Sequence, residues 1–118
     1  MDDNKSISQL KEVVKNFCEE RDWDQYHNAK DLAIGIITES SELLEYFRFK
    51  SLKEVEEVFL HQKEGVSEEL SDILFFVLRL AQLYGIDLSS EFEKKIRKNA
   101  KKYPVEKSKG SNKKYTEY

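Results

Sequence analysis

The fold is decided by one apolar stretch, Val66-Ser-Glu-Glu-Leu-Ser-Asp-Ile-Leu-Phe-Phe-Val-Leu-Arg-Leu-Ala-Gln-Leu-Tyr84. Its apolar residues recur three and four positions apart, which predicts an α-helix, and they cover most of the helix circumference. Gly85 is expected to end the helix, because glycine commonly follows the last turn. A helix that is apolar nearly all round is buried on several sides, so in a chain this short it favours coverage by a partner subunit.

Other helices flank this stretch, and their ends carry recognisable signals. Ser6 and Gln9 have the spacing of a capping box, and Asn28 can cap the next helix. Pro104 ends the last helix. We expect long helices at residues 7–21, 29–48, 66–84 and 88–103, a short helix at 51–60, and a loop near Gly65. Four long helices with short connections predict an all-α, four-helix-bundle-like protomer over residues 1–104, followed by a polar, lysine-rich tail over residues 105–118.

The composition fits a single helical domain. Of 118 residues, 36% are charged and 39% hydrophobic, and one proline with four glycines is too few turn residues for a sandwich or barrel. The net charge of −3 gives no case for nucleic-acid binding. The single cysteine, Cys18, excludes an internal disulfide, and we expect its thiol to be buried. There is no apolar signal core and no apolar run near the ~20 residues of a membrane span, so we expect a cytoplasmic protein without membrane partners.

Two acidic pairs carry most of the functional information: Glu39-Ser-Ser-Glu42 and Glu69-Leu-Ser-Asp72. Residues three apart lie on one face of a helix, so two such helices packed side by side would bring four carboxylates into a small volume. Four anions in a dry site cannot all stay ionised without a counter-charge. Oxygen-only ligands favour Mg²⁺, with Mn²⁺ as a substitute, and such ions usually also bind substrate phosphates. The pattern therefore predicts a metal-dependent nucleotide hydrolase.

The helical wheel places these acids at the margins of apolar faces. On the second helix, the apolar arc expected to face the core consists of Leu32, Ile36, Ile37, Leu43, Leu44 and Phe47. Glu39 borders this arc, and Glu42 lies one step further round. On the third helix Glu69 projects into the apolar arc, while Asp72 lies at its border, close to Arg79. Because a buried unpaired carboxylate is costly, Glu69 needs a metal, a basic side chain or a proton.

Cationic and aromatic residues offer further candidates, each with a plainer alternative. Lys95, Asn99 and Lys102 line one edge of the last helix's apolar stripe, where they suit phosphate groups. Alternatively, the lysines are solvated and stabilised by the helix dipole. Trp23 and Tyr26, before the second helix, bind substrate or plug the end of the bundle. Neither histidine of the chain supports a Ser-His or Cys-His nucleophile.

Motifs along nearly the whole chain resemble one family. They are Glu39-x-x-Glu42 with Glu69-x-x-Asp72, Glu20-Arg-Asp-Trp-Asp-Gln-Tyr-His27, Asn99-x-x-x-Tyr103-Pro104 and Lys114-Tyr-Thr-Glu117. They are similar to the motifs of the MazG-like, all-α nucleoside triphosphate pyrophosphohydrolases, and most similar to those of the dCTP pyrophosphatase branch. The resemblance implies Mg²⁺-dependent hydrolysis of a (deoxy)nucleoside triphosphate to the monophosphate and pyrophosphate. It also implies a homodimer or a homotetramer.

The resemblance implies roles for individual residues as well. The residues that match the family's metal ligands and catalytic acids are Glu39, Glu42, Glu69 and Asp72. The substrate-binding set expected in the same way is Trp23, His27, Phe49, Phe76, Lys95, Asn99 and Lys102. Trp23 matches an aromatic residue that stacks on the base, and Phe49 falls where the branch often has a second tryptophan. Lys95 and Asn99 match positions near the phosphates and the sugar.

Three departures from the family pattern affect what is expected of the substrate. Thr38 stands where many relatives carry a further glutamate, Phe76 where the dCTP-preferring enzymes have tyrosine, and Val14 where some have histidine. The acids are intact, so the hydrolytic chemistry is expected to survive while base preference changes. The alternatives are a non-catalytic helical interaction module and a pyrophosphohydrolase acting on a phosphoribosyl nucleotide. A di-iron bundle is excluded because it needs Glu-x-x-His pairs, which the sequence lacks.

Overall fold

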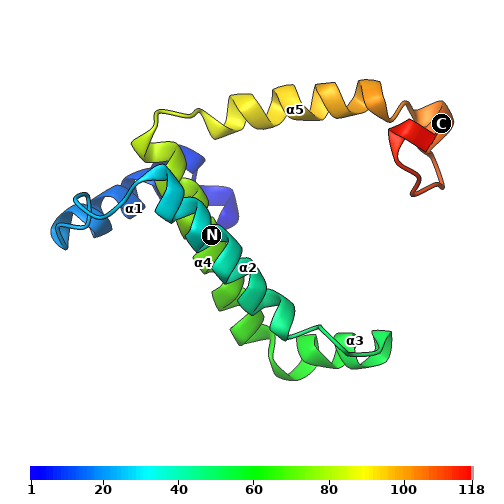
Figure 1. The fold of residues 1–118 in the computed structure, drawn as a ribbon, viewed down its shortest axis with the longest axis horizontal. Helices are drawn as coiled ribbons and strands as arrows, with labels where there is room; N and C mark the ends of the chain where they lie inside the picture. Colours follow the sequence, from blue (N-terminus) through cyan, green and yellow to red (C-terminus); the bar gives the residue numbers. More distant parts are fainter. Residues whose placement is uncertain (118) are drawn as a thin grey trace. The chain divides into compact units, whose positions relative to one another are not determined.

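The computed structural model describes residues 1–117, and every regular element among them is helical. In chain order the elements are η1 (Asp2–Asn4), α1 (Ile7–Glu20), α2 (Ala29–Glu45), α3 (Leu52–His61), α4 (Lys63–Leu83), α5 (Leu88–Lys102), α6 (Val105–Ser108) and η2 (Tyr115–Glu117) (Figure 1). The all-α prediction is therefore confirmed. The chain divides into two compact units, Met1–Gly85 and Ile86–Tyr118. No single helix of the described residues is long and apolar enough to cross a membrane.

The first unit is built around α2 and α4, which lie side by side along their length (Figure 1). Helix α1 packs on the C-terminal half of α4, where Phe17 meets Phe75, and α3 contacts α4 as well. The buried apolar side chains are Val14, Cys18, Leu32, Val58, Val66, Leu78 and Ala81. Burial of the Cys18 thiol, which is 0% exposed, was expected from its place on the apolar stripe. Helix α4 is thus the element that the other three helices of this unit share.

The helix starts follow from local capping. The Ser6 hydroxyl accepts a hydrogen bond from the Gln9 backbone N–H, and the Gln9 side chain accepts one from the Ser6 N–H, which confirms the predicted capping box. The Asn28 side chain accepts from the Asp31 N–H at 2.9 Å and caps α2, also as predicted. Helix α5 starts after Asp87 in the same way. The Asn28 cap fixes the start of α2, the helix that carries Glu39 and Glu42.

Two predicted helix boundaries are wrong. Helix α4 begins at Lys63, so Gly65 lies within a helix and not in a loop. Its missing side chain makes room for Tyr46, because a Cβ atom added at Gly65 would lie 2.1 Å from the Tyr46 hydroxyl oxygen. Helix α2 ends at Glu45 and not near Arg48, and the chain then turns through Phe49, whose φ of 62° lies outside the helical range.

The apolar arc of α2 is only partly buried, so the prediction that the whole arc faces the core is wrong. Leu32 is buried, whereas Ile37 is 68% exposed and Leu44 is 55% exposed. Within the first unit, α4 covers one side of α2, and this leaves the far part of a wide arc uncovered. Leu70 and Leu74 on α4 are likewise exposed, so the apolar surface of α4 extends beyond the core of this unit.

The second unit contains α5 and short helical turns within the segment predicted to be a tail. Helix α6 and the 3₁₀ turn η2 both lie beyond Pro104, which ends α5 as expected. The Tyr103 and Tyr115 rings meet edge to face, with centroids 5.8 Å apart. This contact brings residues near 115 back to the C-terminal end of α5.

A close contact between α2 and α4 depends on Gly35. A Cβ atom added at this position would lie 2.6 to 2.8 Å from three atoms of the Phe76 ring, which is too close for any real contact. The bare backbone of α2 therefore forms the surface on which the Phe76 ring rests.

We expect Gly35→Ala to destabilise the protein, although alanine favours a helix by about 1 kcal/mol over glycine. Overpacking against the Phe76 ring costs about 1–3 kcal/mol, and three ring atoms in the way favour the upper end. Chemical denaturation of the single and double variants with Phe76→Leu would measure this. The smaller side chain should recover most of the loss, and strictly additive effects would contradict a direct clash.

Candidate metal centre and surrounding residues

The four predicted acidic residues come from the two helices that pack against each other. Glu39 and Glu42 lie on α2, and Glu69 and Asp72 lie on α4. Glu39, Glu69 and Asp72 each offer one carboxylate oxygen, and these three oxygens lie within 4.8 Å of one another. Glu42 is near enough to both Glu39 and Glu69 to alter their ionisation. The structure therefore brings all four into one cluster, which we name the acid cluster.

Two oxygens of the acid cluster are buried without a donor. Glu39 Oε2 and Glu69 Oε2 are inaccessible to solvent and accept no hydrogen bond from the described residues. Burial, followed by the neighbouring Glu42 carboxylate, raises the pKa of Glu39 to about 7. Burial likewise raises the pKa of Glu69, again with help from Glu42. Without a cation, the cluster can relieve its repulsion only by holding protons at neutral pH.

These properties fit a hard divalent cation. The donor set consists entirely of carboxylate oxygens, which is the ligand type that Mg²⁺ and Mn²⁺ prefer. A cation would give the two orphaned oxygens the partner that the protein does not supply. Asp72 is exposed, so one side of the cluster faces solvent and is open to a ligand.

Phe76 lies on α4, next to acid-cluster residues of both α2 and α4. It is one turn beyond Asp72 on α4, and its ring rests on Gly35, which is one turn before Glu39 on α2. This places the predicted substrate-binding residue Phe76 beside the predicted metal ligands. The contact was not foreseen, although a glycine inside an apolar helix is a signal of close approach.

A series of aromatic rings connects Phe76 to Trp23. Phe76 meets Phe75 edge to face at 5.6 Å, Phe75 meets Phe17 at 5.9 Å, and Phe17 meets Trp23 at 5.5 Å. The Trp23 ring also lies 5.9 Å from the His27 ring. Trp23 is 36% exposed, so part of the indole remains open for stacking. The aromatic series is thus continuous from the acid cluster to the segment before α2.

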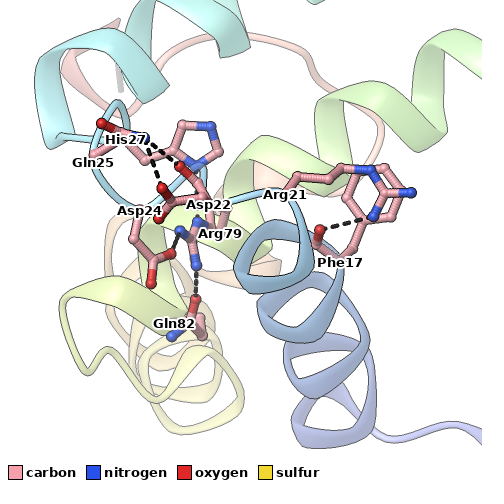
Figure 2. Close-up of polar contacts among 8 residues, drawn as sticks. All are labelled: Phe17, Arg21, Asp22, Asp24, Gln25, His27, Arg79 and Gln82. Carbon is pink, nitrogen blue, oxygen red and sulfur yellow. Dashed lines mark hydrogen bonds and ion pairs between the residues drawn. The ribbon is translucent and has the colours of Figure 1, made fainter.

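A buried polar cluster around Arg79 was missed in the sequence. The Arg79 side chain is fully buried and bonds Asp24, His27 and Gln82 (Figure 2). Asp72 is not one of these partners, so the expected proximity of Asp72 to Arg79 produces no ion pair among the described residues. A single arginine in an otherwise apolar stretch was the available signal, because buried charges are paired.

The predicted substrate-binding residue His27 belongs to the polar cluster. Its Nδ1 atom accepts a hydrogen bond from Arg79 Nε at 2.9 Å. Burial, followed by the nearby Arg79 charge, lowers the pKa of His27. His27 is therefore held neutral, with Nδ1 as the acceptor.

The remaining predicted residues lie elsewhere. Phe49 is 92% exposed in the turn after α2, with the Arg48 guanidinium 4.5 Å from its ring centroid. Lys95, Asn99 and Lys102 lie on α5 in the second unit, and their approach to the acid cluster remains a prediction. The Lys102 ammonium lies 4.9 Å from the Tyr115 ring centroid within that unit.

Comparisons with known proteins agree on one family. Residues 34–118 match the model of the MazG-like family. The chain is 34% identical to dCTP pyrophosphatase 1 of Rattus norvegicus and 31% identical to that of Homo sapiens, over 95% of its own length and 67% of theirs. A crystal structure of a pyrophosphatase from Archaeoglobus fulgidus is similar with a TM-score of 0.78 and 36% identity, covering 82% of this chain and 91% of that one.

The raised pKa of Glu39 predicts an unusual pH dependence in metal-free protein. A carboxyl group that binds its proton more tightly when folded stabilises the fold below its unfolded pKa of 4.5, and this contribution is lost as pH rises towards about 7. We therefore expect the melting temperature in EDTA to fall across that range, and Mg²⁺ to raise it most at the upper end.

Glu39→Gln should remove much of this pH dependence, whereas Glu68→Gln, at an exposed neighbour of Glu69, should leave it intact. Thermal unfolding of both variants with and without Mg²⁺ would measure this. Identical profiles for the two variants would contradict the role given to Glu39.

Proposed function

The chain belongs to the MazG-like family, and from this membership we propose that it is a Mg²⁺-dependent nucleoside triphosphate pyrophosphohydrolase. It hydrolyses the phosphoanhydride bond between the α- and β-phosphates of a (deoxy)nucleoside triphosphate and releases the monophosphate and pyrophosphate. dCTP or a modified deoxynucleoside triphosphate is the proposed substrate, since four relatives are named dCTP pyrophosphatase 1. The similar solved structure, which is titled a pyrophosphatase, supports the same reaction class.

The observation that carries the proposal is the acid cluster with its two orphaned oxygens. Glu39, Glu42, Glu69 and Asp72 would hold the cation. A divalent ion bound there neutralises charge on the phosphates and makes water more acidic. Glu39 and Glu42, both on α2, are the proposed acceptors of the proton from the attacking water.

The base and the phosphates require groups outside the acid cluster. We propose that Trp23 stacks on the base through its open indole, and that Phe76 and His27 line the same side. A base–aromatic stack contributes roughly 1–3 kcal/mol in related systems. Phe49 is proposed as a second stacking residue. The residues proposed to bind the phosphates and the sugar are Lys95, Asn99 and Lys102 on α5.

A homodimer or homotetramer is proposed as the working form. Ile37, Leu44, Leu70 and Leu74 expose apolar surface on both helices that carry the acids. A second copy covering these residues would bury area that a single copy leaves in water. A cytoplasmic location stays the expectation from the sequence.

Glu69→Gln should abolish Mg²⁺-dependent turnover and leave the fold intact or more stable, because it removes one charge from a repelling group. The assay follows pyrophosphate release from a panel of canonical and modified triphosphates. Glu68→Gln is the matched control, since it makes the same change at the exposed neighbouring position.

Parental turnover by Glu69→Gln would refute its assignment as a metal ligand. Calorimetry with Mg²⁺ and a non-hydrolysable triphosphate separates the enzyme from a non-catalytic helical module, since such a module would bind neither.

Phe76→Tyr should tighten the binding of cytosine nucleotides relative to the other bases. Phe76 lies beside the acid cluster, and a tyrosine adds one hydroxyl that can contact the base. The expected gain is about 0.5–1.5 kcal/mol for one new hydrogen bond, measured as the ratio of kcat/KM between dCTP and dTTP. An unchanged ranking of substrates would show that base choice lies elsewhere.

A further inference from the structure

We infer that Arg79 is a positioning residue: it fixes the α1–α2 connector, residues 21–28, on α4 and so sets where Trp23 stands relative to the acid cluster. This inference rests on the proposed function for its kinetic consequence. Its structural part concerns the connector alone and can be tested without turnover.

The first step is the hydrogen bonding of the Arg79 guanidinium. Arg79 Nε donates to His27 Nδ1 at 2.9 Å, Nη1 donates to Gln82 Oε1 at 2.6 Å, and Nη2 pairs with Asp24 Oδ1. All three nitrogens thus have an acceptor, although the side chain is only 1% exposed (Figure 2). Because a buried charge without hydrogen-bond partners is costly, these contacts favour one arrangement of the guanidinium.

The second step is the location of the partners. Asp24 and His27 both lie in the connector, more than fifty residues from Arg79 in the sequence, whereas Gln82 lies on α4 itself. Trp23 stands immediately before Asp24, and its ring contacts the His27 ring. The main chain agrees, since the His27 N–H donates to the Trp23 carbonyl at 3.1 Å. Arg79 therefore binds the connector at two residues. One is Asp24, next to Trp23, and the other is His27, whose ring contacts the Trp23 indole.

The third step links the connector to the acid cluster through one rigid helix. Asp72 and Arg79 lie on α4 seven residues apart, which is two helical turns on the same side and about 10 Å along the axis. At one end of this span lies Asp72, a metal-ligand candidate. At the other end Arg79 holds Asp24 and His27, the residues beside Trp23. The distance from the stacking indole to the acids is therefore set by α4, provided that Arg79 keeps the connector in place.

Arginine suits this role better than lysine. Its planar fork offers donors in fixed directions to an imidazole, an amide and a carboxylate at once. A lysine ammonium is a single point with a flexible stem, and it would not reach three acceptors in this arrangement. Aromatic contact with Phe17 also holds Trp23, and this is the competing explanation that the experiment must exclude.

The experiment uses Asp24→Asn as the main variant, because the Asp24 side chain is 53% exposed and the change is isosteric, so the fold should survive. Asp22→Asn is the matched control: it makes the same substitution in the same connector at a residue that bonds Gln25 and not Arg79. Arg79→Lys and Arg79→Met complete the set. Circular dichroism establishes the temperature range in which each variant is folded.

The first readout is the fluorescence of Trp23, the only tryptophan in the chain. In folded, substrate-free protein, Asp24→Asn and Arg79→Lys should increase acrylamide quenching and shift the emission, while Asp22→Asn should match the parent. Unchanged emission and quenching in both Arg79 variants would overturn the inference and assign Trp23 to the Phe17 contact. This readout stands even if no triphosphate is hydrolysed.

The second readout separates positioning from a loss of fold or metal. In Asp24→Asn the KM for the preferred triphosphate should rise about tenfold or more, because a stacking group misplaced by about 1 Å weakens productive binding. The Mg²⁺ affinity measured by calorimetry should stay within about twofold, since the acid cluster is untouched. Equal losses of Mg²⁺ affinity and of kcat with an unchanged KM would overturn the inference, because Arg79 would then act on the acid cluster.

Discussion

The first unit depends on a close approach of α2 and α4 that brings like-charged carboxylates together. Helices α2 and α4 approach closely because Gly35 accepts the Phe76 ring on bare backbone, and the same approach brings their acidic pairs together. Burial raises the pKa values of Glu39 and Glu69, and one oxygen of each accepts no hydrogen bond from the described residues. The packing that holds this unit together therefore maintains an unfavourable arrangement of carboxylates. Local conflicts of this kind are expected at functional sites.

Signals carried by neighbours along the chain were read correctly from the sequence. The capping residues Ser6 and Asn28, and the acidic pairs spaced three apart, depend only on helix geometry. Features that depend on distant partners were not predicted. Gly65 lies inside α4, where the Tyr46 hydroxyl occupies the place of a side chain, and Arg79 binds Asp24 and His27, which are more than fifty positions away. Periodicity reports which face of a helix is apolar, but it does not report what covers that face, so Ile37 and Leu44 were wrongly placed in the core.

The two charged clusters of the first unit differ in how many of their polar atoms have hydrogen-bond partners. Around Arg79 every guanidinium nitrogen has an acceptor, which makes that cluster rigid and specific. In the acid cluster, Glu39 Oε2 and Glu69 Oε2 have no hydrogen-bond donor within residues 1–117. A network whose nitrogens all have acceptors stabilises the local structure, whereas a cluster with unpaired oxygens can bind a ligand through them. Helix α4 carries both, with the incomplete cluster at its middle and the satisfied one nearer its C-terminal end.

The contact of Phe76 with Gly35 also limits how this protein can diverge. A relative that acquires a different ring at position 76 keeps the helices in place only while position 35 stays without a side chain, and any larger residue at 35 first requires a smaller one at 76. The two sites are therefore epistatic, and the order of substitutions matters. If Phe76 contacts the base as proposed, new base preferences at this position require a glycine to be retained one turn before Glu39, the first metal-binding candidate.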